Sequence, residues 1–329
     1  MIPVPPARQE RTAWRLVDGV PGHEAQSRAL LEALGRLVPL RSFDLPFASR
    51  LGALASLFAG RLRAGDALPP PDLLVGAGHA AHAALLAARR ARGGRAVVLM
   101  RPTLFPLSLF DLCIVPAHDR VAPRANVLET TGVLCAACPS AARDPSRGVV
   151  LLGGPPSRRP LRRRAPWNEE LVARQVVAVV AAVAVAAVAV TVTVSRGAVT
   201  RWTLVPSRRT PASLVARLAT LLPQAALLPW RAGAPSPVPD LLSSAATAWV
   251  TDESVSMVSE ALSAGAGVGL LATGRSGGRV SRGMSDLIAR GLVTTFEAWE
   301  GGAPLRAADP PLDEAARCAR WIAGTWWGA

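Results

Sequence analysis

The sequence predicts an α/β protein with two domains, each built on a parallel β-sheet. Its 329 residues fit two domains at about 150 residues per domain. Half of the residues are hydrophobic, which is enough for a sizeable core and excludes global disorder. Short apolar runs alternate with helical stretches, as in βαβ units, and this order restarts at Gly148.

The first half contains the elements of one such domain. Residues 14–17 read as a buried strand, and a glycine-containing loop leads from it into a helix over 24–37 with leucines on one face. A second helix is expected from the turn at 76–79 to Arg92. Further strands are predicted at 71–75, 96–100 and 112–115, with a short one at 126–128.

The second half repeats the pattern, with strands expected at 149–152, 202–205, 248–251 and 268–271. A terminal helix is expected over 312–327, begun by Asp313 and Glu314, because acidic groups favour a helix N-terminus. We expect a hinge near 144–148. The resulting parts are a flexible N-terminus (1–11), an N-terminal domain (12–146), a C-terminal domain (147–305) and a returning C-terminal helix (306–329).

Residues 176–194 consist of Val and Ala with two threonines, and they admit two interpretations. About 20 apolar residues suffice to span a bilayer, so a single transmembrane span is one. The other, which we prefer, is burial within the second domain, because Val alternates strictly from Val188 onward, as in a buried strand. It gives a helix from about Asn168 and then a strand. Residues 1–11 lack an apolar stretch, so we expect a cytoplasmic protein, with peripheral association with the inner membrane left open.

The net charge of +14 would ordinarily suggest a polyanionic partner. However, the chain has no Lys, no Tyr and two Asn, a bias typical of GC-rich codons. Aromatic residues make up 5%, too few for the stacking platforms of nucleic-acid sites, so we expect no nucleic-acid partner. Four cysteines in this length form no disulfide scaffold. Neither the lone Cys135–Cys138 pair nor the His79–His82 pair has further ligands at metal spacing, and no metal or cofactor is predicted.

One motif in the second half suggests a phosphate site. A strand ends at Thr251, and Asp252 and Ser254 can cap the helix that follows, whose first N–H groups suit a phosphate. Ser256 lies in the same turn, and Glu260 lies further along, where a carboxylate could accept hydrogen bonds from ribose hydroxyls. An ordinary capped helix with Glu260 in solvent is the alternative.

A second strand end repeats this design. Ser207 is followed by Arg208 and Arg209, then by Thr210 as the expected N-cap and Pro211 at the first helical position. Ligands of α/β folds bind outside the carboxyl ends of the strands, where either arginine could pair with a diphosphate. A solvated surface pair is the alternative. Gly153 and Gly154 form a further glycine turn at a strand end.

His23 is the candidate catalytic base. It lies at a strand-to-helix turn, beside Asp18 and Glu24, where an imidazole can accept a proton at neutral pH. A capping or packing role is the alternative.

The chain resembles the elongated-mitochondria fission-factor family, which has plant mitochondrial members and many bacterial ones. The matching motifs run in order along nearly the whole chain: 14–35, 74–78, 110–111, 116–119, 126–128, 153–157, 207–211 and 251–261. The chain departs from the family pattern at 236–238, which replace an Asn-Pro-Tyr, and at His79 and Arg101.

That family is in turn similar to GT-B glycosyltransferases, so the resemblance implies two Rossmann-like domains facing a cleft. It implies a nucleoside diphosphate or nucleotide sugar held by the C-terminal half, and a terminal helix that crosses back around Trp321. It also implies an acceptor, with membrane association as one option, near Gly22, His23, Gly76, Gly78 and His118. The function implied is nucleotide-sugar binding with glycosyl transfer. A non-catalytic interaction protein on the same fold is the alternative.

Overall fold

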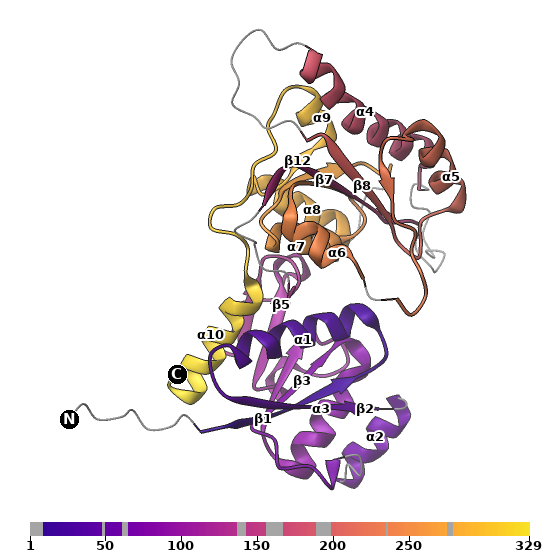
Figure 1. Cartoon of the computed structure of the whole chain (residues 1–329). Helices are drawn as coiled ribbons and strands as arrows, with labels where there is room; N and C mark the ends of the chain where they lie inside the picture. Colours follow the sequence, from indigo (N-terminus) through magenta and orange to yellow (C-terminus); the bar gives the residue numbers. More distant parts are fainter. Residues whose placement is uncertain are drawn as a thin grey trace, which may run out of the picture. The chain divides into compact units, whose positions relative to one another are not determined.

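The computed structural model describes residues 9–47, 50–60, 65–136, 143–155, 167–188, 199–234, 236–274 and 279–329. The chain forms two compact units (Figure 1). Unit 1 comprises Met1–Ala136 together with Asp313–Ala329, and unit 2 comprises Ala137–Leu312. The boundary expected near residue 146 falls within a strand of unit 2, β7 (Asp144–Leu152).

Unit 1 contains a six-stranded sheet in the order β2-β1-β3-β4-β5-β6, and every pair of neighbouring strands is parallel. Its strands are β1 (Arg11–Val17), β2 (Leu40–Pro46), β3 (Leu73–Ala77), β4 (Arg95–Leu99), β5 (Leu112–Pro116) and β6 (Val127–Thr130). Its helices are α1 (Pro21–Gly35), α2 (Arg50–Ala59), α3 (Gly78–Arg92) and α10 (Glu314–Trp327), with the short turns η2 (Leu107–Leu109) and η3 (Ala117–Asp119).

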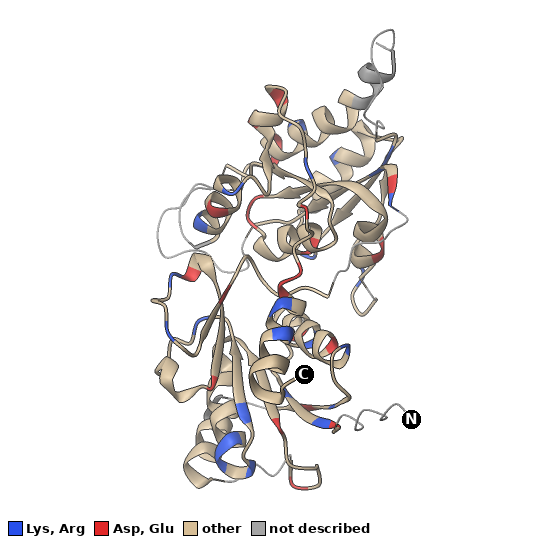
Figure 2. Cartoon of the chain, turned by 90° about the vertical axis from the view of Figure 1, so that its left-hand side faces the viewer, with Lys and Arg blue, Asp and Glu red and all other residues tan. Residues whose placement is uncertain are grey.

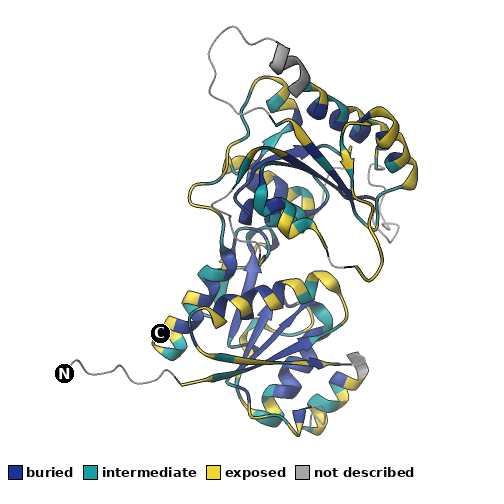
Figure 3. Ribbon diagram, viewed as in Figure 1, coloured by how far each residue is buried: buried dark blue, intermediate teal, exposed yellow. Residues whose placement is uncertain are grey.

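Helices cover both faces of this sheet, which explains why its central strands are apolar throughout. Every residue of β3 and β5 is buried, and alternate side chains enter opposite cores. Val75 packs in the core below α1 and α10, whereas its neighbour Leu74 packs in the core below α2 and α3. Figure 3 shows the buried strands between partly exposed helices.

The terminal helix α10 belongs to the first of these cores, with Cys318, Ala319 and Ile322 fully buried beside α1. Asp313 caps it, as its side chain accepts a hydrogen bond from the Ala316 N–H at 2.9 Å. This confirms the role predicted for an acidic group at the start of the helix.

Unit 2 contains a second parallel sheet, in the order β12-β11-β10-β7-β8-β9. Its strands are β7, β8 (Arg201–Pro206), β9 (Ala226–Leu227), β10 (Ala245–Thr251), β11 (Gly267–Leu271) and β12 (Thr294–Thr295). Its helices are α4 (Glu169–Val188), α5 (Ala212–Leu221), α6 (Val238–Ser244), α7 (Val255–Ser263), α8 (Arg279–Ala289) and α9 (Phe296–Glu300). Two parallel sheets covered by helices confirm the predicted fold class.

The Val/Ala segment is helical in its first part, because α4 continues to Val188. Val176, Val179 and Val180 are buried against the sheet in the core that α4 shares with α5. Residues 189–194, where a strand was expected, lie outside the described residues. Within the described part of the chain, no helix combines the length and apolar character that crossing a membrane requires.

Two elements of unit 1 were not predicted: β2 and α2. The burial of β2 shows why, because only Leu45 of its residues is buried, so it lacks the apolar run by which the other strands were found. It lies at the edge of the sheet and pairs with β1 alone. Charged residues are distributed over both units in the view of Figure 2.

Candidate functional site

Unit 2 contains a cavity of about 510 Å³ at the carboxyl ends of β7 and β8. Apolar side chains of these strands and of α7, including Leu151, Val205 and Met257, line one part of it. Its polar lining consists of Ser207, Arg208, Trp230, Arg231, Ser236, Ser256 and Glu260. Four residues predicted from separate motifs (Ser207, Arg208, Ser256 and Glu260) therefore line one cavity, which we call the unit 2 pocket.

Ser256 and Glu260 reach this pocket together because they are four residues apart on α7, which places them on one face of the helix. Burial raises the pKa of the Glu260 carboxyl to about 7. No hydrogen bond or ion pair to the Glu260 side chain is found among the described residues. The pocket therefore presents a carboxyl group that changes charge near neutral pH and whose oxygens can accept hydrogen bonds from a ligand.

The two arginines after β8 take different directions. Arg208 is exposed and lines the pocket. Arg209 instead donates to the carbonyl of Gly154 at 3.2 Å and lies 3.7 Å from the carboxylate of Glu253. Arg209 is not among the residues that line the pocket containing Glu260. Its guanidinium is occupied in joining two strand ends.

Glu253 is the residue that sequence reasoning missed. Its side chain is 7% exposed, and its Oε1 accepts the N–H of Gly154 at 2.9 Å. Burial raises the pKa of the Glu253 carboxyl, and the Gly154 N–H and Arg209 oppose that shift. A Cβ on Gly153 would lie 1.6 Å from Oε1, so the Gly153–Gly154 turn is required for this contact. Only its position beside Asp252 in the motif could have drawn attention to Glu253.

The side chains that were predicted to cap helices at this edge make other hydrogen bonds. Thr210 does not cap α5, which begins one residue later than expected after Pro211. Its hydroxyl accepts the N–H of Ser207 at 2.8 Å and lies 2.7 Å from the carbonyl of Gly153. Thr210 thereby ties β7 to β8.

Ser254 is the N-cap residue of α7, and its side chain likewise makes no capping hydrogen bond. Asp252 accepts from the hydroxyl of Thr273 at 2.6 Å, joining the ends of β10 and β11. Ser254 is buried, does not line the pocket, and lies 3.4 Å from the hydroxyl of Ser256. The side chains of Thr210 and Ser254 therefore do not cap α5 and α7 as predicted, whereas Thr210 and Asp252 make hydrogen bonds to neighbouring loops.

Unit 1 positions His23 at the first turn of α1, just after the carboxyl end of β1. Its Nδ1 lies 2.8 Å from Oδ2 of Asp18, whose side chain is 7% exposed. Nε2 has no partner among the described residues. A carboxylate on one ring nitrogen fixes the tautomer and leaves the other nitrogen able to accept a proton.

Gly78 completes the setting of His23. It has φ +77, and a Cβ at this position would lie 2.2 Å from Cε1 of the imidazole. Only glycine allows both the left-handed backbone and this close approach. Gly76 has a packing role, since a Cβ there would meet Ala81 of α3 at 2.9 Å. Gly22 contributes its carbonyl to Gln26 in the first turn of α1.

His118 follows β5, in the turn η3. Its Nε2 lies 3.7 Å from the carboxylate of Asp119. In the described residues, no three His, Cys, Asp or Glu side chains gather in a way that could hold a metal ion. Cys135 is buried, and its partner in the CxxC motif, Cys138, lies outside the described residues.

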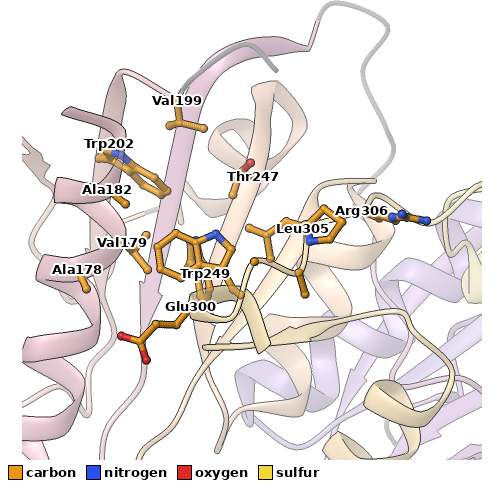
Figure 4. A pocket seen from close by; sticks show the side chains of 14 residues that line it. Ala178, Val179, Ala182, Val199, Trp202, Thr247, Trp249, Glu300, Leu305 and Arg306 are labelled. Atoms are coloured by element: carbon orange, nitrogen blue, oxygen red, sulfur yellow. The ribbon is translucent and has the colours of Figure 1, made fainter. Parts of the chain in front are cut away.

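Unit 2 has a larger cavity of about 860 Å³ at the amino ends of β8 and β10 (Figure 4). Trp202, Trp249 and Trp299 line it. Glu300 and Arg306 direct their charged groups away from the labelled tryptophans. None of the predicted site residues lines this cavity, whereas four of them line the unit 2 pocket.

Known structures share this fold. The UDP-GlcNAc 2-epimerase from Methanocaldococcus jannaschii matches with a TM-score of 0.56 and 10% identity, over 95% of this chain and 99% of its own. The enzyme from Neisseria meningitidis bound to UDP-GlcNAc matches with a TM-score of 0.52 and 10% identity, over 98% and 100%. The glycotransferase of kitacinnamycin matches with a TM-score of 0.51 and 12% identity, over 95% of each chain.

These similarities define the class: the chain has the GT-B fold found in nucleotide-sugar enzymes. The family model described as Mitochondrial fission ELM1 matches residues 21–326, and the chain belongs to that family. No curated protein matches the sequence.

Proposed function

We propose that the unit 2 pocket binds the nucleoside diphosphate part of a nucleotide sugar. The observation that supports this is the grouping of Arg208, Arg231, three serines and Glu260 around one cavity. Guanidinium groups bind diphosphate oxygens through charge-assisted hydrogen bonds, and the Glu260 carboxylate suits ribose hydroxyls. At about 510 Å³ the cavity is in the usual range for small-molecule sites.

Trp230 gives the same pocket a planar surface. Trp230 is 51% exposed and lines the pocket, so its ring is accessible to a ligand. Stacking of a base on an aromatic side chain contributes about 1–3 kcal/mol. We assign to Trp230 the binding of the base and to the neighbouring Arg231 a contact with the phosphates or the base edge.

We further propose that the chain transfers the sugar to an acceptor hydroxyl, with His23 as the general base. The acceptor oxygen attacks the anomeric carbon, and the bond from this carbon to the phosphate oxygen breaks. The hydroxyl proton passes to Nε2 of His23, while Asp18 stabilises the resulting imidazolium. The nucleoside diphosphate leaves with the bonding electrons.

Isothermal titration calorimetry with UDP, GDP and UDP-GlcNAc tests the binding step. UDP-GlcNAc is the first donor to test, because one structural relative was solved with it bound. We expect saturable binding that Arg208→Gln weakens at least tenfold, with Arg306→Gln of the same unit as the control. Binding that is equal in the parent and in Arg208→Gln would contradict the assignment.

A non-catalytic interaction protein on the same fold is the second candidate, and the family's description as a mitochondrial fission family favours it. One measurement distinguishes the two candidate functions, the release of nucleoside diphosphate. A transferase releases nucleoside diphosphate from the nucleotide sugar in the presence of acceptor, and His23→Ala slows the release at least about a hundredfold. An interaction protein binds the nucleotide, if at all, without turnover in either form.

A further inference from the structure

A turn of two glycines, residues 153–154, follows β7 and lies between two segments that supply polar groups to the unit 2 pocket. The order of the sheet places β7 between β8 and β10. The segment after β8 carries Ser207 and Arg208. The helix after β10, α7, carries Ser256 and Glu260. This glycine turn therefore separates the two polar parts of the pocket.

The segment between β10 and α7 binds both N–H groups of the glycine turn. The hydroxyl of Thr251 accepts the N–H of Gly153 at 2.8 Å. Oε1 of Glu253 accepts the N–H of Gly154 at 2.9 Å. Two side chains just before α7 thus bind consecutive N–H groups, and they tie the start of this helix to the end of β7.

The segment after β8 binds both carbonyl groups of the same turn. The hydroxyl of Thr210 lies 2.7 Å from the carbonyl oxygen of Gly153, and Arg209 donates to the carbonyl of Gly154 at 3.2 Å. A Cβ on Gly154 would lie 1.9 Å from the carbonyl oxygen of Arg209, so the two backbones are also in close contact. The glycine turn is therefore held from both sides.

Glu253 takes part in this arrangement at a cost in stability. Its Oε2 is buried and has no hydrogen-bond partner among the described residues, which is unfavourable for a polar atom. An apolar side chain of similar size would pack there without this penalty, so packing alone does not explain a carboxyl group. Burial also raises the pKa of this carboxyl. A protonated carboxyl group still accepts a hydrogen bond, so the contact with Gly154 requires an acceptor oxygen and not a full charge.

We propose that Glu253 is a positioning residue of the unit 2 pocket. By binding the N–H of Gly154 it fixes the glycine turn as a spacer between the segment after β8 and the first turn of α7. Glu253 does not line the pocket, so it acts on a ligand only through the groups that it positions. In taking this ligand to be a nucleoside diphosphate, the proposal rests on the proposed function.

Calorimetric titration of the full chain with UDP tests the role of Glu253. Glu253→Met keeps the volume of the side chain but removes the acceptor, and it should weaken UDP binding at least tenfold. Glu253→Gln keeps an acceptor oxygen at the same reach, and its Kd should stay within about threefold of the parent. A lower melting temperature of Glu253→Met with an unchanged Kd would overturn the proposal, because it would show a role in stability alone. Glu253→Ala is the second variant, should Glu253→Met not fold.

Glu314 provides the matched control. It is also buried and paired with an arginine, Arg317, but it belongs to α10 of unit 1. Glu314→Met should lower the melting temperature and leave the Kd for UDP unchanged. If Glu314→Met weakened UDP binding as much as Glu253→Met, general destabilisation would explain both effects and the proposal would fail.

Amide exchange of the proteins without ligand keeps this role apart from the proposed function. Residues 205–208 and 255–260 should exchange faster in Glu253→Met than in the parent, and at the parent rate in Glu253→Gln. If this pattern is found and the parent binds no nucleotide, the positioning role stands and the nucleotide function fails. If the parent binds UDP and Glu253→Met matches it in both exchange and affinity, the function stands and the positioning role is refuted.

Discussion

The carboxyl edges of the two sheets differ although both units follow the same parallel α/β plan. In unit 2 this edge bears a cavity that contains the carboxyl group of Glu260. Burial raises the pKa of this carboxyl to about 7. In unit 1 it bears histidines and exposed arginines, and the acids Asp18 and Asp119 are engaged with His23 and His118. The unit 2 edge therefore combines arginines with a single carboxyl group in a cavity, whereas the unit 1 edge combines arginines with histidines that lie beside carboxylates.

From this difference we propose separate tasks for the two units, with nucleotide binding in unit 2 and proton acceptance by His23 in unit 1. A carboxylate that accepts hydrogen bonds suits the hydroxyl groups of a nucleoside, whereas an imidazole group suits a proton. Each of the substitutions proposed here should change the function of one sheet edge and leave that of the other unchanged. A substitution that impairs both functions would contradict the separation of tasks.

The largest effect is expected at His23. His23→Ala removes the base, and general-base catalysis contributes typically 10²–10⁴-fold, so we expect kcat to fall at least a hundredfold in a steady-state transferase assay. The Kd for UDP should be unchanged, because His23 belongs to unit 1. A kcat within threefold of the parent would refute the role of His23.

Gly78→Ala should have the next largest effect. The new Cβ would overlap the His23 imidazole, and φ +77 is strained for alanine. We expect a loss of about 1–2 kcal/mol in the free energy of unfolding, measured in urea, and at least a tenfold loss of kcat. Gly93→Ala, at the other end of α3 with φ +76 and nothing within 4 Å, is the matched control. It shares the backbone strain and should keep kcat.

In unit 2, the same substitution at Arg208 and at Arg209 should have different effects. Arg208→Gln should weaken UDP binding by about 1.5–3 kcal/mol, the range for hydrogen bonds to charged groups, with the melting temperature unchanged. Arg209→Gln should instead lower the melting temperature, because it leaves Glu253 buried beside one fewer partner. The reverse pattern would show that the two arginines are assigned the wrong way round.

The smallest effect is a pH dependence at Glu260. Its folded-state pKa of about 7 exceeds the usual value near 4.3, so the folded state binds more protons and loses stability as pH rises from about 4.5 to 7. Glu260→Gln should remove this loss and be more stable than the parent at pH 8 but not at pH 4.5. Thermal melts across this range provide the measurement.

Ligand binding should show the opposite trend. The ionised carboxylate is the better acceptor for ribose hydroxyls, so the UDP affinity of the parent should rise several-fold between pH 6 and 8. Glu260→Gln should show a flat profile. A steep profile in both proteins would locate the titrating group elsewhere.

The sequence predicted the strands that are buried on both faces, because these give continuous apolar runs. It missed β2, whose edge position leaves most of its residues exposed. It also assigned ten residues to one phosphate site, since the carboxyl ends of parallel strands share an edge, and four of them (Ser207, Arg208, Ser256 and Glu260) line the unit 2 pocket. These predictions depend on the periodicity of apolar residues and on the order of strands and helices, and both can be read directly from the sequence.

Side-chain direction could not be predicted in the same way. Nothing in the sequence distinguishes Arg208 from Arg209, and the difference arises from a contact with Glu253, which is 44 residues away along the chain. Thr210 and Asp252 were expected to cap helices, but they bind loops that only the folded sheet brings near. Tertiary contacts decided both cases.

Hydrogen–deuterium exchange of the full chain with and without UDP tests the central claim most directly. The account predicts slower exchange on UDP binding in three segments of the unit 2 pocket, residues 205–208, 228–238 and 255–260, with the segments around His23 and His79 unchanged. UDP binding by calorimetry without protection of these segments, or with protection confined to unit 1, would contradict the assignment of the nucleotide to unit 2.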